Sequence, residues 1–213
     1  MTTKVPGGML DDAALEDLGG ATLAQGDVLY YNGSNLVNLG AGTSGYFLKT
    51  QGAAANPVWA AHTDNGKILQ VVNVMNGAVA TGTTVLPMDD TIPQNTEGDE
   101  YMTLAITPAS ATNKLLIEVV FYFANTAADN FTVALFQDTT AGALAAGFKQ
   151  ETANHLECIS FNHYMTTGTT SATTFKVRAG NGTAGTTTFN GQSSARLLGG
   201  VLASSITIRE ILV

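Results

Sequence analysis

The stretch that decides the fold is Asn113-Lys-Leu-Leu-Ile-Glu-Val-Val-Phe-Tyr-Phe-Ala124. Successive side chains of a β-strand point to opposite faces of the sheet. One face of this segment is apolar throughout and consists of Leu115, Ile117, Val119, Phe121 and Phe123. The other face carries Leu116, Val120 and Tyr122 beside Glu118. A strand that is apolar on both sides is usually covered on both sides, and in a two-layer sandwich another subunit can supply the second cover.

The same kind of pattern continues on both sides of this strand, over residues 67–213. Short β-prone segments recur at regular spacing and are separated by turn clusters such as Asp129-Asn130 and Gly180-Asn181-Gly182. We expect strands at 67–75, 78–86, 101–107, 113–124, 130–137, 144–150, 155–165, 173–179, 185–190, 195–199 and 204–212. No convincing helical period interrupts them. The pattern predicts an all-β knob, an antiparallel β-sandwich of jelly-roll type.

Residues 23–66 read as two β-hairpins followed by a linker at 62–66. The first hairpin joins Asp27–Tyr31 to Asn35–Leu39, and its Asn32-Gly33 favours a type I′ turn. The second joins Gly45–Thr50 to Val58–Ala60. Two hairpins bury little apolar surface by themselves, so their aromatic side chains need a neighbour.

Residues 1–22 form a separate N-terminal segment. Asp11-Asp12 and the following Ala-Ala-Leu-Glu-Asp-Leu predict a short helical turn that ends at Gly19-Gly20. This segment is too short to fold alone. It packs either on its own domain or into a partner.

Charge and composition exclude several functions. The 213 residues carry 9 Lys and Arg against 17 Asp and Glu, a net charge of -8, which excludes binding to nucleic acid through its phosphates. The acidic N-terminus has no apolar core and is not a signal peptide. No run approaches the roughly 18 apolar residues that span a bilayer, so we expect no membrane insertion. Cys158 is the only cysteine, which excludes an intrachain disulfide and an all-cysteine zinc cage.

Three motifs bear on chemistry, and none specifies an enzyme or a cofactor. Gly40-Ala-Gly-Thr-Ser-Gly45 matches a dinucleotide fingerprint in its letters, but a strand follows it and not a helix. His155 and His163 lie too far apart on one strand to share an ion, although a ring of equivalent histidines on a three-fold axis stays open. The acidic residues of segment 89–100 read as a solvated loop, a calcium loop or a carboxylate pair for glycoside hydrolysis.

Two longer stretches resemble tail-fibre proteins of tailed bacteriophages. The first runs from Gly26-Asp-Val-Leu-Tyr-Tyr-Asn-Gly-Ser through Gly-Thr-Ser-Gly-Tyr-Phe-Leu to Asn56-Pro-Val-Trp-Ala60 and resembles a fibre-shaft module. The second resembles a fibre-tip knob through segments 104–117, 133–138, 171–177 and 203–211, in that order. Together they cover most of residues 23–213.

This resemblance implies a non-enzymatic virion protein, made in the host cytoplasm and assembled as a homotrimer without cofactors. Residues 1–22 would attach to other virion proteins, residues 23–66 would form the shaft, and residues 67–213 the knob that adheres to a host glycan or protein. For attachment we expect Met9, Leu10, Leu15 and Leu18, and for the trimer interface Leu116, Val120 and Tyr122. For receptor-facing loops we expect Asn125, Asp129, Asn130, Thr140, Asn181 and Thr183.

Two other functions stay open. A head fibre or capsid decoration protein would share this build, and the single shaft module, where long fibres repeat it many times, suits a short projection. A capsular depolymerase would need paired acids in a groove and usually a long β-helix with regular repeats.

Overall fold

The computed structural model describes residues 23–62 and 66–213, which belong to two compact units divided between Thr63 and Asp64. The predicted attachment residues Met9, Leu10, Leu15 and Leu18 lie outside the described residues.

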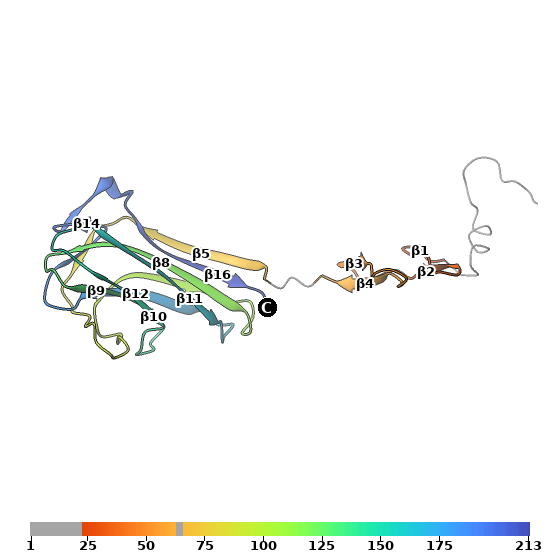
Figure 1. Ribbon diagram of the computed structural model, residues 1–213, viewed down its shortest axis with the longest axis horizontal. Helices are drawn as coiled ribbons and strands as arrows, with labels where there is room; N and C mark the ends of the chain where they lie inside the picture. The colour runs from red at the N-terminus through yellow and green to blue at the C-terminus, as the bar shows by residue number, and fades with distance from the viewer. Residues whose placement is uncertain (1–22, 63–65) are drawn as a thin grey trace, which may run out of the picture. The chain divides into compact units, whose positions relative to one another are not determined.

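The second unit is an antiparallel β-sandwich, which confirms the predicted fold class (Figure 1). One sheet has six strands, ordered β5-β16-β8-β13-β6, with β11 also paired to β8; the other has four, ordered β10-β9-β12-β7. The six-stranded sheet contains β5 (Ile68–Asn76), β6 (Ala80–Gly82), β8 (Lys114–Asn125), β11 (Glu157–Thr166), β13 (Thr187–Phe189) and β16 (Ser204–Ile211). The four-stranded sheet contains β7 (Asp99–Ile106), β9 (Asn130–Gln137), β10 (Ala145–Gln150) and β12 (Thr173–Asn181). A small hairpin of β14 (Gly191–Gln192) and β15 (Ala195–Arg196) and the 3-10 turn η1 (Leu198–Gly200) precede β16.

The strand order is that of a jelly roll. The first and last long strands, β5 and β16, pair antiparallel in one sheet, while β7 and β12 pair in the other. Strands from the two ends of the second unit therefore lie side by side, as two Greek keys require. Leu212 donates its backbone N–H to Lys67 O at 2.9 Å, so the C-terminus closes against the start of β5.

The core lies between the sheets, and β8 contributes most to it. Its residues alternate between fully buried and half-buried, which confirms the period-two pattern of segment 113–124. Phe123 stacks on Phe131 of β9 with ring centroids 3.7 Å apart, and Phe121 meets Tyr101 of β7 at 5.4 Å. Aromatic contacts across the two layers hold the sandwich together.

The expected strand at 78–86 is wrong beyond Gly82. From residue 83 to 98 the chain is largely irregular and lies over the outer face of the four-stranded sheet, where Leu86 packs against Ala134 and Phe136. Leu86 donates its N–H to Asn181 O at 3.0 Å, so its hydrogen bond goes to the end of β12 and not into a ladder. This cover explains why β9 is buried on both faces. The expected strand at 195–199 is likewise reduced to β15 and the turn η1.

The first unit contains both predicted hairpins. β1 (Val28–Tyr31) pairs with β2 (Leu36–Leu39), and β3 (Tyr46–Lys49) pairs with β4 (Val58–Ala61). The predicted type I′ turn is wrong, since four residues separate the last pair and only Gly33 among them has a positive φ, of 98°. Asn32 Oδ1 accepts hydrogen bonds from the N–H groups of Ser34 and Asn35 at 2.9 Å and shapes this wider loop.

The two hairpins are joined through Trp59. Its indole N–H donates to Gly40 O at 2.6 Å, and its ring lies so close to Gly42 that an added Cβ would stand 2.6 Å from ring carbons. Asp27 accepts hydrogen bonds from Asn38 Nδ2 and Ala41 N, both at 3.0 Å. The Gly-x-Gly stretch is therefore a site of close packing.

Candidate interaction surfaces

The first candidate surface is the outer face of the six-stranded sheet, which we call the sheet face. The register places Leu116 between Tyr164 and Arg209, and Val120 between Ser160 and Ser205. On β5, Val71 extends the row of Leu116, and Met75 extends the row of Val120. Met75 is 69% exposed and Tyr164 is 55% exposed. The predicted interface residues Leu116, Val120 and Tyr122 lie on this face and are half-buried, so the face presents apolar side chains to solvent.

A polar row crosses the middle of the sheet face. Asn162, Glu118, Thr207 and Asn73 follow one another across the sheet, and Arg209 forms an ion pair with Glu118. A hollow of about 340 Å³ lies over Glu118, Val120 and Asn162. Cys158 pairs with Tyr122 in the ladder and is exposed. The face thus combines apolar rows with a central ion pair and one thiol.

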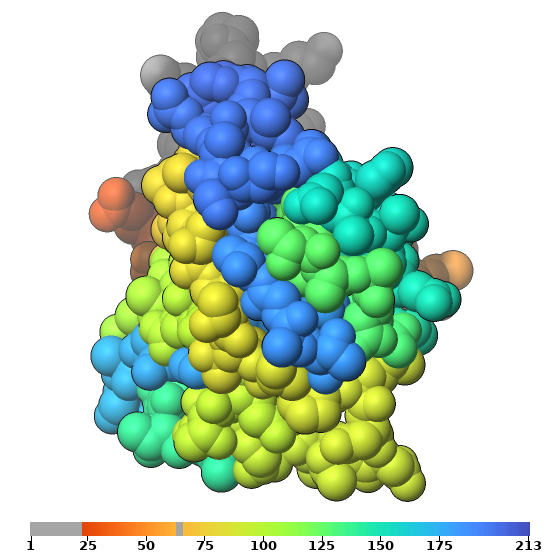
Figure 2. Space-filling model, turned by 90° about the vertical axis from the view of Figure 1, so that its left-hand side faces the viewer, coloured from red at the N-terminus to blue at the C-terminus, as the bar shows by residue number. Residues whose placement is uncertain are grey.

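The second candidate surface is one end of the sandwich, where the 125–130 turn lies between two neighbouring segments (Figure 2). In that view the turn is green, the segment near 150–156 is teal and the segment near 182–186 is blue. Asn154 N donates to Asn125 O at 2.7 Å, and Thr126 N donates to Thr186 O at 3.1 Å. Asp129 and Asn130 are half-buried at this end, and Thr183 is exposed.

Two of the six predicted receptor-facing residues are wrong, because the structure buries them. Asn125 and Asn181 end β8 and β12 and are 1% and 2% exposed. Asn125 donates from Nδ2 to Thr187 Oγ1 at 3.0 Å and accepts from Ala127 N at 2.8 Å, so its amide is used inside the fold. Thr140 is exposed but follows the far end of β9 from Asn130, so it does not join the same surface.

Glu151 is a buried carboxyl group at the same end of the sandwich. One of its oxygens accepts a hydrogen bond from Asn125 N, and the other is buried without a partner within the described residues. Burial and the neighbouring Glu157 raise the pKa of Glu151 from 4.5 to about 7, although the Asn125 hydrogen bond lowers it. This carboxyl group therefore titrates near neutral pH.

The acidic residues of segment 89–100 do not converge. Asp89 accepts from Thr91 N at 2.8 Å, Asp99 accepts from Thr84 N at 2.9 Å, and Glu97 accepts from Gln94 N at 2.8 Å. The hydrogen bonds to Thr91 lower the pKa of Asp89. In the described ranges, 23–62 and 66–213, no three His, Cys, Asp or Glu side chains gather as a metal site would require. These carboxylates shape the 83–98 segment locally.

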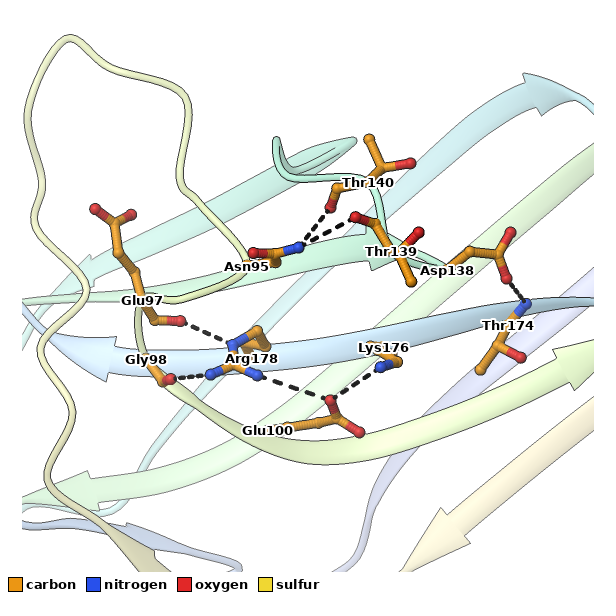
Figure 3. Close-up of polar contacts among 10 residues, drawn as sticks. All are labelled: Asn95, Glu97, Gly98, Glu100, Asp138, Thr139, Thr140, Thr174, Lys176 and Arg178. Atoms are coloured by element: carbon orange, nitrogen blue, oxygen red, sulfur yellow. Dashed lines mark hydrogen bonds and ion pairs between the residues drawn. The ribbon is translucent and has the colours of Figure 1, made fainter.

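The third candidate surface is a polar groove on the outer face of the four-stranded sheet, which we call the β12 groove (Figure 3). One wall is Asn95, whose Nδ2 donates to Thr139 O at 3.3 Å and Thr140 O at 3.2 Å. The opposite wall is Lys176, Arg178 and Glu100. The groove has a volume of about 240 Å³, with Phe136 and Asp138 completing its lining.

The charged side chains of the β12 groove form ion pairs, but these do not use all of their hydrogen-bond donors. Arg178 donates to Glu97 O at 2.9 Å and to Gly98 O at 2.6 Å, which holds the 83–98 segment on the sheet. Its Nη1 lies 3.7 Å from Glu100 Oε2, and Lys176 Nζ lies 3.6 Å from the same oxygen. The sequence-based predictions omitted Lys176 and Arg178. The Lys-x-Arg spacing in an otherwise acidic chain could have indicated this site. Side chains two residues apart on a strand lie on the same face of the sheet, so the two cations are neighbours.

Comparison with known proteins gives remote likenesses only. No protein-family model and no curated protein matches the chain. Among solved structures, Eiger TNF from S. frugiperda is similar at 8% identity and a TM-score of 0.39, covering 67% of this chain and 93% of that one. The structure of infectious bursal disease virus, Gx strain, is similar at 13% identity and a TM-score of 0.34, covering 83% of this chain and 43% of that one. The VP2 subviral particle of the same virus follows at 12% identity and a TM-score of 0.30, covering 84% and 44%.

The chain spans less than half the length of the two viral chains. Likenesses this remote carry no inference about function. Among the described residues, no helix has the length and apolarity needed to cross a bilayer.

Proposed function

We propose that this chain is a bacteriophage virion protein, a short trimeric tail fibre whose knob adheres to the host surface. The proposal includes no catalytic step and no cofactor. In this proposal residues 23–66 form the shaft and its linker, residues 67–213 form the knob, and residues 1–22 attach to other virion proteins.

The observation that carries the proposal is the exposure of β3 in the shaft. All four of its residues are exposed, including Tyr46 at 44%, Phe47 at 43% and Leu48 at 47%. Since neighbouring strand residues face opposite sides, this hairpin shows apolar side chains on both faces. Covering a half-exposed apolar side chain contributes about 1 kcal/mol, so a lone shaft forgoes several kcal/mol.

Further copies of the same chain supply that cover in our proposal. Closed cyclic symmetry brings identical patches together around one axis, and three copies suit a fibre whose shaft winds around that axis. The sheet face of the knob, with Val71, Met75 and Tyr164, is the second contact between copies. The resemblance of segments 26–60 and 104–211 to fibre modules supports the same assembly.

A head fibre or capsid decoration protein is the second candidate, and the short shaft favours it. Only two hairpins occur between Val28 and Ala61 in the described part of the shaft, which suits a short projection. Immunogold labelling of intact particles with antibodies to the knob separates the two. We expect label at the tail; label on the head would establish the second candidate, and particles without label would contradict both.

Adhesion is tested by competition. The purified chain should reduce adsorption of particles to host cells, because it occupies the receptor without delivering a genome. Unchanged particle adsorption in the presence of excess purified chain would contradict adhesion through the knob.

A further inference from the structure

We propose that the β12 groove binds a saccharide ring, with Lys176 as the principal hydrogen-bond donor. This inference rests on the proposed adhesion to the host and names the site on the knob that would bind the host surface. It moves the binding site from the loops at the end of the sandwich to the outer face of the four-stranded sheet.

The donors on one wall of the groove are incompletely used. A lysine ammonium has three N–H donors. Within the described ranges, the Lys176 ammonium has an ion pair with Glu100 at 3.6 Å and no hydrogen bond. Arg178 uses Nε and Nη2 on backbone carbonyls, while its Nη1 has only the ion pair at 3.7 Å. Two cationic groups that share one carboxylate oxygen keep donors for a ligand.

Acceptors line the same groove as these donors. Asp138 accepts from Thr174 N at 2.7 Å and from Thr173 Oγ1 at 2.8 Å, and each carboxylate oxygen has a second lone pair. Sugar hydroxyls donate and accept at once, so they match a site where donors and acceptors alternate. An apolar ligand would leave the charged groups without partners. A phosphate would meet two carboxylates, Glu100 and Asp138, beside the cations.

The walls of the groove are fixed before any ligand binds. Asn95 ties the 83–98 segment to the carbonyl groups of Thr139 and Thr140, and Arg178 ties the same segment to β12 (Figure 3). Residues held in this way lose little conformational freedom when a ligand binds. The groove also lies on the opposite sheet from the sheet face, so association of copies through that face leaves it open.

Saturation-transfer difference NMR on the full chain tests the site directly. The probes are glucose, galactose, N-acetylglucosamine and glucuronate, each at about 10 mM because a small open site gives weak affinity. We expect saturation transfer to at least one of them. Glucuronate alone would indicate that a carboxylate pairs with Lys176, whereas a neutral sugar would indicate that hydroxyls suffice; both support the proposal.

Variants connect the signal to the groove. Lys176→Met keeps the aliphatic stem and should weaken the saturation transfer about ten-fold, since it removes a charged donor. Thr139→Val on the other wall keeps the side-chain size and should weaken the signal less. Arg196→Met removes a positive charge from an exposed residue of β15 and should leave the signal unchanged.

The proposal is overturned if no probe receives saturation, or if Lys176→Met retains the full signal while Arg196→Met behaves identically. A negative result in the sugar-binding experiment says nothing about trimer formation, because the light-scattering mass of the purified chain is measured without any sugar. If the chain is a trimer but binds none of the probes, the fibre proposal stands and the saccharide site in the β12 groove is wrong.

Discussion

Replacing Glu151 with glutamine should stabilise the knob at alkaline pH and have little effect in acid. Burial raises the pKa of this carboxyl group from 4.5 to about 7 in the folded chain. The folded state therefore binds the proton more tightly than the unfolded state, and stability falls as the pH rises from about 4.5 to 7. Each pKa unit corresponds to about 1.4 kcal/mol, so the full shift is worth about 3 kcal/mol.

Relaxation of the fold and entry of water around the charged form reduce that figure, and we expect about 1–2 kcal/mol at pH 8. Glutamine keeps the acceptor for Asn125 N and has no charge to bury. For a domain of this size the gain corresponds to a rise in Tm of about 3–6 °C at pH 8 and under about 1 °C at pH 4.5.

Differential scanning calorimetry at the two pH values, at equal protein concentration, measures this difference. Asp90→Asn changes an exposed carboxylate in the same way and serves as the matched control. The reasoning is refuted if Glu151→Gln shifts Tm equally at pH 4.5 and pH 8, because the buried charge would then contribute nothing.

Three further changes probe the buried carboxylate of Glu210, the shaft and the sheet face. Glu210→Ala removes the carboxylate that binds Asn113 Nδ2 and the backbone N–H groups of residues 109 and 110; it should cost about 2–4 kcal/mol in urea unfolding at pH 7, and an unchanged midpoint would contradict this. Gly42→Ala should displace the ring of Trp59, which an added Cβ would approach to 2.6 Å, and red-shift the fluorescence of the single tryptophan; an identical emission spectrum would contradict it. Met75→Glu should shift the association equilibrium toward monomer by at least about ten-fold in light scattering, since it places a charge in the proposed apolar contact; the control Ile92→Glu, at a 63% exposed residue of the 83–98 segment over the other sheet, should not.

The sandwich was predictable because alternation of side chains is a local property. Leu115, Ile117 and Val119 fall on one face in any straight strand, and the structure buries all three. The hairpins were predictable because the preference of turn residues is also a local property of the sequence. The turn type was not, because the side chain of Asn32 closes a four-residue loop with its own hydrogen bonds.

Features set by distant contacts were not predictable. Segment 83–86 has strand-like residues, yet Leu86 packs on Ala134 and Phe136, which lie about fifty residues further along the chain. Asn125 and Asn181 resemble loop residues in sequence, but both end long strands and are buried. The β12 groove needs Asn95, Asp138 and Lys176 from three separate parts of the chain, which a single sequence does not bring together.

The central claim, that three copies of this chain form the fibre, is tested most directly by the light-scattering mass of the full chain. One chain has a mass of 22.0 kDa, so a trimer of three times 22.0 weighs about 66 kDa. We predict about 66 kDa at micromolar concentration. A mass of 22.0 kDa across the whole concentration range would contradict the account, because the exposed residues of β3 and of the sheet face would then have no copy to cover them.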